Sequence, residues 1–334
     1  MRAWENSRIK VHLVGDINID FTLIGILEVP NLNKDLGMET RVRDISYTVG
    51  GSGFNFIKAI SSFGLEVDFY AKVGKDFYGN YIRDYLKREN IGNSLIVDYK
   101  VKTGICTVIP IKNDRILLTF NGGNEKISID DIDLKELEYS THVHLSSYYL
   151  LKGLQPKILS ILKFLKSSGI TTSFDTGFDP DENWQGDKIF SILKYIDVFI
   201  PNKIEALNIT NKRSVEDALN LLSNYCPTVI IKMGPEGLVG KERDDLKEKN
   251  VVYISPYDID VVDTTCCGDC FDAGFVYSYL KGFSFKKNLL FANACGALQA
   301  TKIGSYRFKG IGEIEDFMDK NKLKGDLRSR TVTL

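Results

Sequence analysis

The sequence has almost no surplus of charge and no long apolar run, and each absence excludes a class of protein. The 334 residues include 43 Lys and Arg against 44 Asp and Glu, a formal net charge of -1. This balance argues against nucleic-acid binding as the main task. No apolar run approaches the ~20 residues that cross a bilayer, so we expect no membrane partner. Residues 1–10 are polar and lack the apolar core of a signal peptide, and we therefore expect a cytoplasmic protein.

Two well-known phosphate-binding loops are also missing. The P-loop pattern G-x-x-x-x-G-K-[ST] does not occur in the chain. A glycine-rich stretch at 50–53 opens a helical pattern, but the third glycine of a dinucleotide fingerprint is replaced by Phe56. The sequence therefore excludes both of these loops.

Metal and redox sites have only weak support. Three of the six cysteines cluster, and a disulfide framework is not expected in a cytosolic chain of this size. Cys267-x-x-Cys270 matches a redox or half-zinc pattern, but no second pair of ligands follows nearby. His142 and His144 share one face of an expected strand, with no carboxylate nearby. We interpret these histidines as core or rim residues, and a thiol redox function stays an alternative.

The stretch 261–275 is the most informative part of the chain. It begins with β-branched residues, tightens at Gly268 and continues into an apolar segment, which predicts a strand end, a tight turn and a helix start. The free N–H groups of such a turn favour anions. Asp269 would repel a phosphate, but it suits a general base beside a phosphoryl group. The local pattern leaves a helix N-cap as an equal alternative.

Strand and helix patterns alternate through the middle of the chain. Strands are expected at 142–145, 171–175 and 198–201, with helices at 156–167 and 187–195. This alternation predicts a parallel sheet that is covered on both faces.

The stretch 263–271 resembles the second signature of the ribokinase-like (PfkB) sugar kinase family, D-T-x-G-A-G-D-x-F. The matching residues are Asp263, Thr264, Gly268, Asp269 and Phe271. Cys266 and Cys267 replace the usual Gly-Ala pair. The resemblance implies that Asp269 is the catalytic base and that the backbone at Cys266, Cys267 and Gly268 forms the anion hole. A thiolate is favoured near a helix N-terminus, so we also expect some thiol reactivity at this turn.

Two further segments are similar to the acceptor side of the family. Residues 50–59 resemble the first signature, G-G-x-x-x-N-x-A, and residues 15–20 resemble the opening G-x-x-x-x-D. The substrate-binding residues that this implies are Asn18, Asp20, Gly51, Ser52 and Asn55. A carboxylate suits vicinal hydroxyls because it accepts two hydrogen bonds. Taken alone, the pattern at 15–20 is weak and favours a surface turn over a functional site.

The nucleotide side resembles the family in three places, at 202–205 (N-x-x-E), at 232–237 (K-x-G-x-x-G) and in a small-residue helix at 291–301. The nucleotide-binding residues implied are Asn202, Glu205, Lys232, Gly234, Gly237, Asn293 and Ala297. Glu205 would hold Mg²⁺ through water. A capping pair of Asn202 and Glu205 is the plainer alternative.

One segment departs from the family pattern D-P-N-x-R-x-x-x-W. Asp175 and Trp184 match, but Gly177 and Asp179 stand where relatives have Asn and Arg. This departure leaves the substrate open.

The resemblance implies an α/β fold with a doubly wound, mostly parallel sheet flanked by helices and a small β-sheet lid. The kinase domain would comprise 1–20, 50–100 and 121–320. The lid would comprise 21–49 and 101–120, with a hairpin at 104–120, and 321–334 would form a polar, frayed tail.

The activity implied is transfer of the γ-phosphoryl group of ATP to a hydroxyl of a small sugar or sugar-like acceptor, with Mg²⁺ as cofactor. A monovalent cation such as K⁺ and a homodimer through the lid are further options. A nucleoside kinase of the same family and a catalytically weak sugar or nucleotide sensor stay as alternatives.

Overall fold

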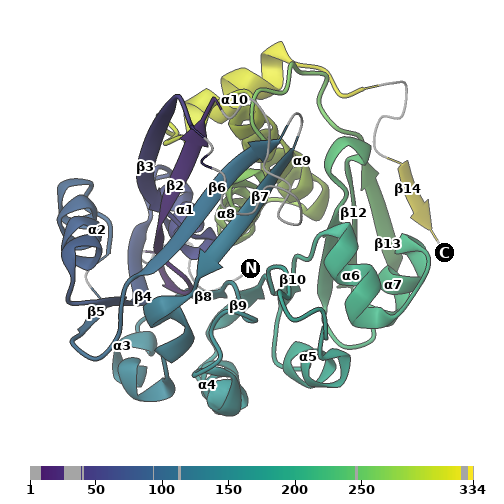
Figure 1. The fold of residues 1–334 in the computed structure, drawn as a ribbon. Coiled ribbons are helices and arrows are strands. Elements are labelled where there is room, and N and C mark those ends of the chain that lie inside the picture. Colours follow the sequence, from purple (N-terminus) through teal and green to yellow (C-terminus); the bar gives the residue numbers. More distant parts are fainter. Residues whose placement is uncertain are drawn as a thin grey trace.

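The computed structural model describes residues 9–25, 39, 41–92, 94–111, 114–244, 247–324 and 330–333. Within them the strands form a 10-stranded sheet and a 4-stranded sheet (Figure 1). The strands are β1 Lys10–Val14, β2 Asn18–Ile24, β3 Asp44–Gly50, β4 Glu66–Gly74, β5 Leu95–Asp98, β6 Gly104–Ile111, β7 Asp114–Phe120, β8 His142–Leu145, β9 Thr171–Phe174, β10 Val198–Phe199, β11 Thr228–Lys232, β12 Leu238–Asp244, β13 Lys247–Ile254 and β14 Arg330–Thr333. The helices are α1 Ser52–Ser61, α2 Phe77–Arg88, α3 Leu134–Leu137, α4 Ile158–Ser167, α5 Gly186–Leu193, α6 Lys203–Thr210, α7 Val215–Leu222, α8 Cys267–Leu280, α9 Phe285–Ala300 and α10 Ile311–Lys320.

The large sheet is doubly wound, as predicted. Its order is β14-β13-β12-β11-β10-β9-β8-β1-β4-β5. From β1 the chain moves first to β4 and β5 on one side and later to β8, β9, β10 and β11 on the other, and these neighbours pair in parallel. The last strands, β12, β13 and β14, are antiparallel.

The prediction of a frayed tail is wrong for residues 330–333. They form β14, which pairs with β13 at the edge of the large sheet (Figure 1). A polar segment can add to a sheet edge because the backbone, not the side chains, makes the ladder.

Two apolar layers cover the two faces of the large sheet. Successive residues of β1 divide between them, with Leu13 in one layer and Val14 in the other. Helices α1, α8, α9 and α10 complete the first layer, and α4, α5, α6 and α7 complete the second. This two-sided burial explains why the inner strands read as nearly continuous apolar runs.

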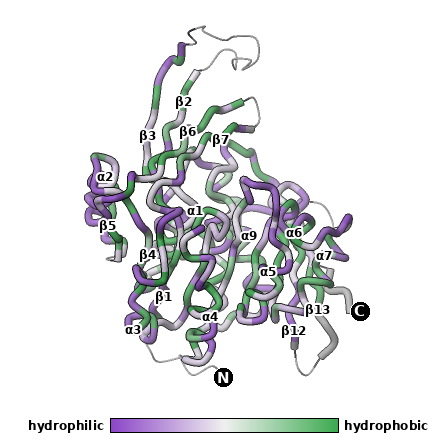
Figure 2. The backbone as a smooth tube through the Cα atoms, turned by 60° about the horizontal axis from the view of Figure 1, so that its bottom comes forward, coloured by the Kyte–Doolittle hydropathy of each residue, from purple (hydrophilic) through white to green (hydrophobic). Residues whose placement is uncertain are grey.

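The small sheet, with order β3-β2-β6-β7, is the predicted lid. Its strands project from the body of the molecule (Figure 2). Because β2 begins at Asn18, both Asn18 and Asp20 lie on a lid strand rather than in the kinase body where the expected boundary placed them. Residues 26–38 and 40 of the expected lid and residues 112–113 of the expected hairpin lie outside the described residues.

Among the described helices, none combines the length and the apolar character that a membrane crossing requires.

The loops that carry the predicted site share one edge of the large sheet. Residue 16 follows β1, residue 147 follows β8, residue 175 follows β9, residue 202 follows β10 and residue 234 follows β11. Parallel strands end at the same edge, and the chain reverses direction across the sheet at β1. A crevice at such a switch point is where open α/β sheets bind ligands.

Candidate active site

Asn18 and Asp20 lie side by side on one face of β2, as a two-residue spacing on a strand requires. The Asn18 amide donates to Asp20 Oδ1 at 2.5 Å. Gly50 lies beneath them, and a Cβ there would come within 2.0 Å of Asp20 Oδ2. Burial raises the pKa of Asp20 to about 6. The two side chains therefore form one rigid polar pair of the kind that hydroxyl groups bind.

Asp16 belongs to the site, although sequence reasoning gave it no role. Its Oδ1 accepts from the Gly53 N–H at 2.8 Å and from the Ser147 hydroxyl at 2.7 Å. The carboxylate thus caps the first turn of α1 from a neighbouring loop. Gly51 has φ 102, and a Cβ there would lie 2.9 Å from oxygens of Asp16 and Asn18. The signal was the Gly15-Asp16 pair that opens the G-x-x-x-x-D segment, and two residues are too short a pattern to interpret.

Ser52 and Asn55 stand in the first turn of α1, and Asn55 reaches across to the predicted base. Its amide Nδ2 donates to Asp269 Oδ2 at 2.9 Å, across a sequence separation of 214 residues. Asn55 Oδ1 is buried and has no hydrogen-bond partner among the described residues. A buried acceptor without a hydrogen bond lowers the stability of the folded protein by about 1–3 kcal/mol. This oxygen is therefore placed to accept a hydrogen bond from a ligand hydroxyl.

Asp269 lies in the first turn of α8 with a perturbed acidity. Burial raises the pKa of its carboxyl to about 7, and the charges of Asp175 and Asp16 act in the same direction. The hydrogen bond from Asn55 and the charge of Lys232 oppose the rise. A carboxyl with a pKa near neutrality can accept a proton and release it again.

The turn before α8 is strained at Cys266. This residue is the N-cap of α8, with φ 64 in the left-handed region that glycine normally occupies. Glycine adopts this conformation without that strain. The Cys267 N–H points back to the Thr264 carbonyl at 3.4 Å. Of the predicted anion hole, Gly268 therefore has the backbone that is best placed for a ligand.

The cysteines of this turn are not reactive thiolates. Burial, with Asp263 and Asp269 nearby, raises the pKa of the Cys267 thiol to about 12, and burial with Asp269 also raises the pKa of Cys266. The expectation that the helix N-terminus favours a thiolate at this turn is therefore wrong, because the burial and the carboxylates outweigh its effect. Cys267 and Cys270 are free thiols.

Lys232 is the centre of a buried ion cluster beneath the turn. Its ammonium lies 2.7 Å from Asp175 Oδ2 and 2.9 Å from Asp272 Oδ1. Burial opposes its charge, but the two carboxylates outweigh burial and raise the pKa of Lys232, while Lys232 lowers that of Asp175 to about 2 against the effect of burial. A Cβ on Gly268 would lie 3.4 Å from the ammonium. Lys232 thus lies directly under the N-terminus of α8.

Asn202 and Glu205 form the capping box of α6. The backbone N–H of Asn202 donates to Glu205 Oε2 at 2.8 Å, and the Glu205 N–H donates to Asn202 Oδ1 at 2.9 Å. Burial raises the pKa of Glu205 to about 8, and the charge of Asp175 adds to the rise. The capping interpretation is confirmed, and each carboxylate oxygen keeps a lone pair that could face water around a cation.

The other residues of the predicted nucleotide side shape turns and a helix. Gly234 and Gly237 have positive φ in the turn between β11 and β12, and a Cβ on Gly237 would come within 2.1 Å of the Ile254 carbonyl. Asn293 on α9 donates to the Ser255 carbonyl at 3.0 Å. Ala297 is a half-buried residue one turn further along α9.

Asp179, His142 and His144 have structural roles. Asp179, which replaces the arginine of relatives, accepts from the N–H groups of residues 181, 183 and 184 and so holds its own loop together. His142 and His144 are buried and both contact the Ser173 hydroxyl at 2.7 Å. They are core residues, as predicted.

The sequence profile of the pfkB family carbohydrate kinases matches residues 8–309. The chain belongs to this family. It is therefore a phosphotransferase with an alcohol group as acceptor. The site brings together the Asn18–Asp20 pair, Asp269 and the N-terminus of α8. The predicted fold class and family are confirmed.

Similar proteins support the family assignment, and a solved structure supports the fold. An uncharacterized sugar kinase of Archaeoglobus fulgidus is 30% identical over 224 residues, which are 67% of this chain and 86% of that protein. The ATP-dependent ribose-1-phosphate kinase of Halopiger xanaduensis is 28% identical, over 89% of this chain and 94% of that protein. The E. coli protein described as ribokinase II, in complex with ATP and Mg²⁺, superimposes with a TM-score of 0.79 at 22% identity, over 93% of this chain and 99% of that one.

Proposed function

We propose that this pfkB family kinase transfers the γ-phosphoryl group of ATP to a hydroxyl of a small sugar or sugar-like acceptor, with Asp269 as the general base. The observation that carries the proposal is the hydrogen bond from Asn55 to Asp269. It joins the acceptor side of the crevice to the helix N-terminus where a phosphoryl group would lie. A hydroxyl held beside Asn18, Asp20 and Asn55 would therefore be within reach of the base.

The chain's own residues divide the work of such a transfer. Asp20 and Asn18 bind and orient the acceptor hydroxyls, and the orphaned Asn55 Oδ1 accepts from one of them. Asp269 accepts the proton of the attacking hydroxyl. The backbone N–H groups at Gly268, with Lys232 beneath them, stabilise charge on the transferring group.

ATP with Mg²⁺ is the proposed phosphoryl donor, as in the E. coli complex. When bound, Mg²⁺ would neutralise charge on the phosphates. Glu205 fits an outer-shell role because Asn202 fixes its carboxylate while leaving lone pairs for water. The turn with Gly234 and Gly237 and the helix face with Asn293 and Ala297 are the proposed nucleotide contacts.

Arg115 of the lid contacts the turn that precedes α8, beside which a phosphoryl group would lie. Strand pairing places Arg115 of β7 on the same face of the lid as Asp20. Its guanidinium donates to the Thr264 hydroxyl at 3.2 Å. A cation at this place supports an acceptor that carries an acidic group, so sugar acids and sugar phosphates belong in any substrate screen.

The test is ADP release with a panel of free sugars, sugar acids, sugar phosphates and nucleosides, with the Asp269→Asn protein as the blank. We expect turnover with a sugar or sugar-like acceptor that the variant lacks. Turnover with nucleosides alone would replace this proposal by the nucleoside kinase alternative. ATP binding without turnover on any acceptor would favour the sensor.

Asp20→Ala should weaken acceptor binding by about 10–100-fold, the usual loss for a charge-assisted hydrogen bond, and leave ATP affinity unchanged. The measurement is KM for the acceptor, with ATP affinity from calorimetry. Asp44→Ala is the control, because Asp44 is an exposed carboxylate at the far end of the neighbouring lid strand. An equal loss of acceptor and ATP affinity would place Asp20 outside the acceptor site.

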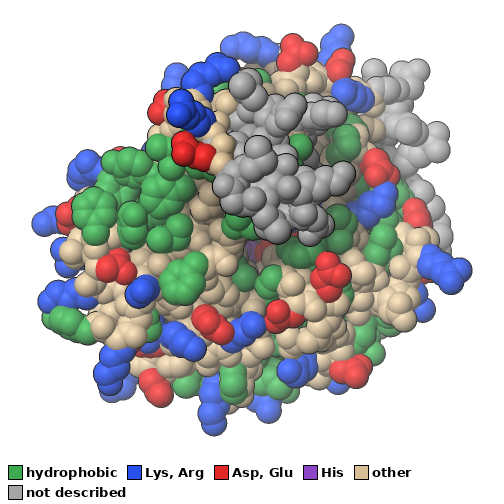
Figure 3. All heavy atoms as spheres, viewed as in Figure 1, with side chains coloured by type: hydrophobic (Ala, Val, Ile, Leu, Met, Phe, Trp, Pro, Cys, Tyr) green, Lys and Arg blue, Asp and Glu red, His purple; other side chains and the backbone are tan. Residues whose placement is uncertain are grey.

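We also propose a homodimer formed through the outer face of the lid. By strand alternation, five apolar side chains share the face opposite Asp20 and Arg115. Each is between 39% and 57% exposed, and they are Ile45, Tyr47, Ile116, Leu118 and Phe120. Figure 3 shows hydrophobic side chains gathered on the side where β3 and α2 lie. An exposed apolar sheet face of this kind is typical of an interface.

Leu118→Glu should convert the dimer into a monomer, because it buries a charge at the centre of the proposed interface. Light scattering after size-exclusion chromatography measures the mass. Ile204→Glu on α6, an equally exposed position away from the lid, should leave the mass unchanged. A wild-type protein that is monomeric at micromolar concentration would contradict the dimer.

A further inference from the structure

His12 has a ring nitrogen with nothing to bond. The residue lies on β1 and is fully buried, and its Nδ1 is 2.7 Å from the Ser140 hydroxyl. The other nitrogen, Nε2, is buried without a hydrogen-bond partner among the described residues. A buried polar atom in this state costs about 1–3 kcal/mol, which suggests that a group absent from the polypeptide completes the site.

Two carboxylates from different elements lie beside the His12 ring. Asp68 on β4 is the direct cross-strand partner of His12, and Glu136 comes from the first turn of α3. One ligand atom from each of the three residues lies within 4.8 Å of the others, and the described chain contains no second such group of His, Cys, Asp and Glu. Glu136 is exposed and can turn inward.

The separation of Nε2 and Asp68 Oδ2 suits a shared ion better than a hydrogen bond. It is 3.7 Å, whereas an N–H···O bond spans about 2.7–3.2 Å. Two ligands at about 2.1 Å from one ion, with an angle of 110–120° between them, lie about 3.4–3.6 Å apart. The observed distance is therefore close to that of two ligands on one divalent ion.

The surroundings hold both ligands in place. The backbone N–H groups of Phe69 and Ser94 donate to Asp68 Oδ1 at 2.8 and 3.1 Å, and the Ser94 hydroxyl donates to Oδ2 at 3.0 Å. Ser140 can accept from His12 Nδ1, which would leave the Nε2 lone pair directed at the carboxylates. Orientation of a ligand histidine through its second nitrogen, and of a ligand carboxylate by donors, is the pattern seen around bound metals.

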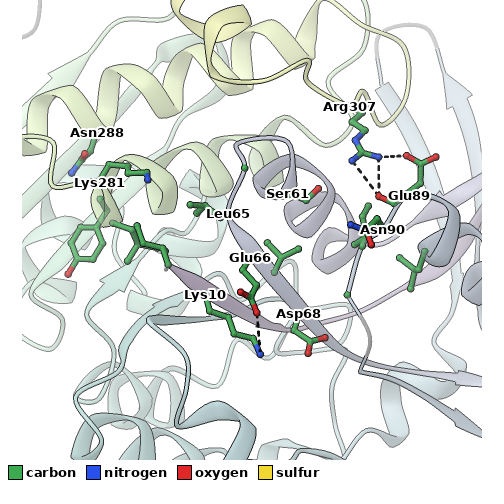
Figure 4. Close-up of a pocket in the computed structure, with 18 of the residues that line it drawn as sticks. Lys10, Ser61, Leu65, Glu66, Asp68, Glu89, Asn90, Lys281, Asn288 and Arg307 are labelled. Carbon is green, nitrogen blue, oxygen red and sulfur yellow. Dashed lines mark hydrogen bonds and ion pairs between the residues drawn. The ribbon is translucent and has the colours of Figure 1, made fainter. Parts of the chain in front are cut away.

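The local charge also favours a cation. Acidic side chains outnumber basic ones here. Asp68 and Glu136 are two of the three clustered ligands, Glu66 lies on β4 as Asp68 does, and the Lys10 ammonium lies 3.9 Å from Glu66. Figure 4 shows Asp68 beside this Lys10–Glu66 pair at the edge of a surface groove, which gives an ion a route from solvent.

We propose that His12, Asp68 and Glu136 bind a divalent transition-metal ion of the Zn²⁺ type. One imidazole with two carboxylates is a ligand set for Zn²⁺ or Mn²⁺ rather than for Mg²⁺ or Ca²⁺, which prefer oxygen alone. The ion would link β1, β4 and α3 away from the carboxyl-end edge that carries Asp269, so its effect is on stability and not on phosphoryl transfer. This inference does not depend on the proposed function.

The test is calorimetric titration of the full chain with Zn²⁺ after treatment with a chelator and dialysis. We expect one site per chain with micromolar or tighter affinity, unaffected by excess Mg²⁺. Saturating Zn²⁺ should raise the melting temperature by roughly 5 °C, since a ligand of the folded state stabilises it by mass action. Absence of a saturable site would overturn the proposal.

Matched variants assign the ligands. Glu136→Gln should weaken Zn²⁺ binding at least ~10-fold, the usual cost of a lost contact at a metal site, while Glu138→Gln, an exposed carboxylate next to the same helix, should bind like the wild type. Kinase turnover should be equal in both. Zn²⁺ binding that Glu136→Gln leaves unchanged would place the ion elsewhere, for example at the cysteines, and would refute the site. In nitrogen-15 NMR spectra, Zn²⁺ should shift Nε2 of His12, and an unshifted Nε2 would also refute it.

Discussion

Asp269→Asn should lower kcat by ~10²–10⁴, the contribution of a positioned general base, while ATP still binds. Asn preserves the size of the side chain and still accepts the hydrogen bond from Asn55. It cannot take the proton of the attacking hydroxyl. Steady-state ADP release measures kcat, and calorimetry measures ATP affinity. A variant with near-normal turnover would remove Asp269 from the mechanism.

The acidity of Asp269 adds a pH test of the same assignment. Burial raises the pKa of this carboxyl to about 7, and a base must be ionised to act. The kcat/KM of the wild type should therefore fall as the pH drops below about 7. A profile that is flat between pH 5 and 8 would contradict the role of Asp269.

The melting temperature of Asp269→Asn distinguishes the loss of a base from a general loss of structure. The pKa of Asp269 is higher in the folded protein than in the unfolded chain. Ionisation of Asp269 at pH 7 therefore lowers the free energy of unfolding. Asp269→Asn removes this charge, so the variant should melt at or above the wild-type temperature. Low turnover together with a raised or equal melting temperature would separate a lost base from an unfolded protein.

Lys232→Met should destabilise the protein by about 3–5 kcal/mol, the usual cost of breaking a buried ion pair from one side. The substitution leaves Asp175 and Asp272 buried together without their cation. It also removes the positive charge beneath Gly268, so we expect weaker ATP binding in the folded fraction. Urea denaturation measures the free energy of unfolding.

Lys203→Met is the matched control for Lys232. Lys203 lies 2.7 Å from Glu236, but both side chains are exposed. Exposed pairs contribute about 0–1 kcal/mol, so the control should unfold within that range of the wild type. The triple variant with Asp175→Asn and Asp272→Asn should recover much of the lost stability, since no buried charge remains. If Lys232→Met costs no more than Lys203→Met, the cluster is not a structural element of the site.

Local pattern was sufficient for much of the fold. Strands at 142–145 and 171–175 and the helix before 167 were predicted within a few residues, because buried parallel strands and amphipathic helices have distinct periods. The turn at Gly268 and the start of α8 were also local features. The polar tail was not predictable, since pairing of β14 with β13 uses backbone groups that every sequence carries.

The roles of single residues were harder to predict from the sequence. Asn55 was predicted to bind the acceptor, but its contact with Asp269 spans 214 residues and depends on how α1 and α8 pack. Lys232 was assigned to the nucleotide from a motif. The structure adds two carboxylate partners that the motif does not contain, one from the loop after β9 and one from α8. The acidity of Cys267 was predicted in the wrong direction because burial is not a local property.

The sequence by itself determined the alternation of strands and helices in the middle of the chain and the turn and helix start around Gly268. These features depend on short-range periodicity and turn chemistry, which neighbouring residues encode. The motifs added the resemblance to one family, and the doubly wound class followed from that resemblance. The tertiary structure alone decided which side chains meet, as in the Asn55–Asp269 contact, the Lys232 cluster and the orphaned nitrogen of His12. Such meetings depend on the packing of distant elements at distances of a few ångström, and no local pattern carries that information.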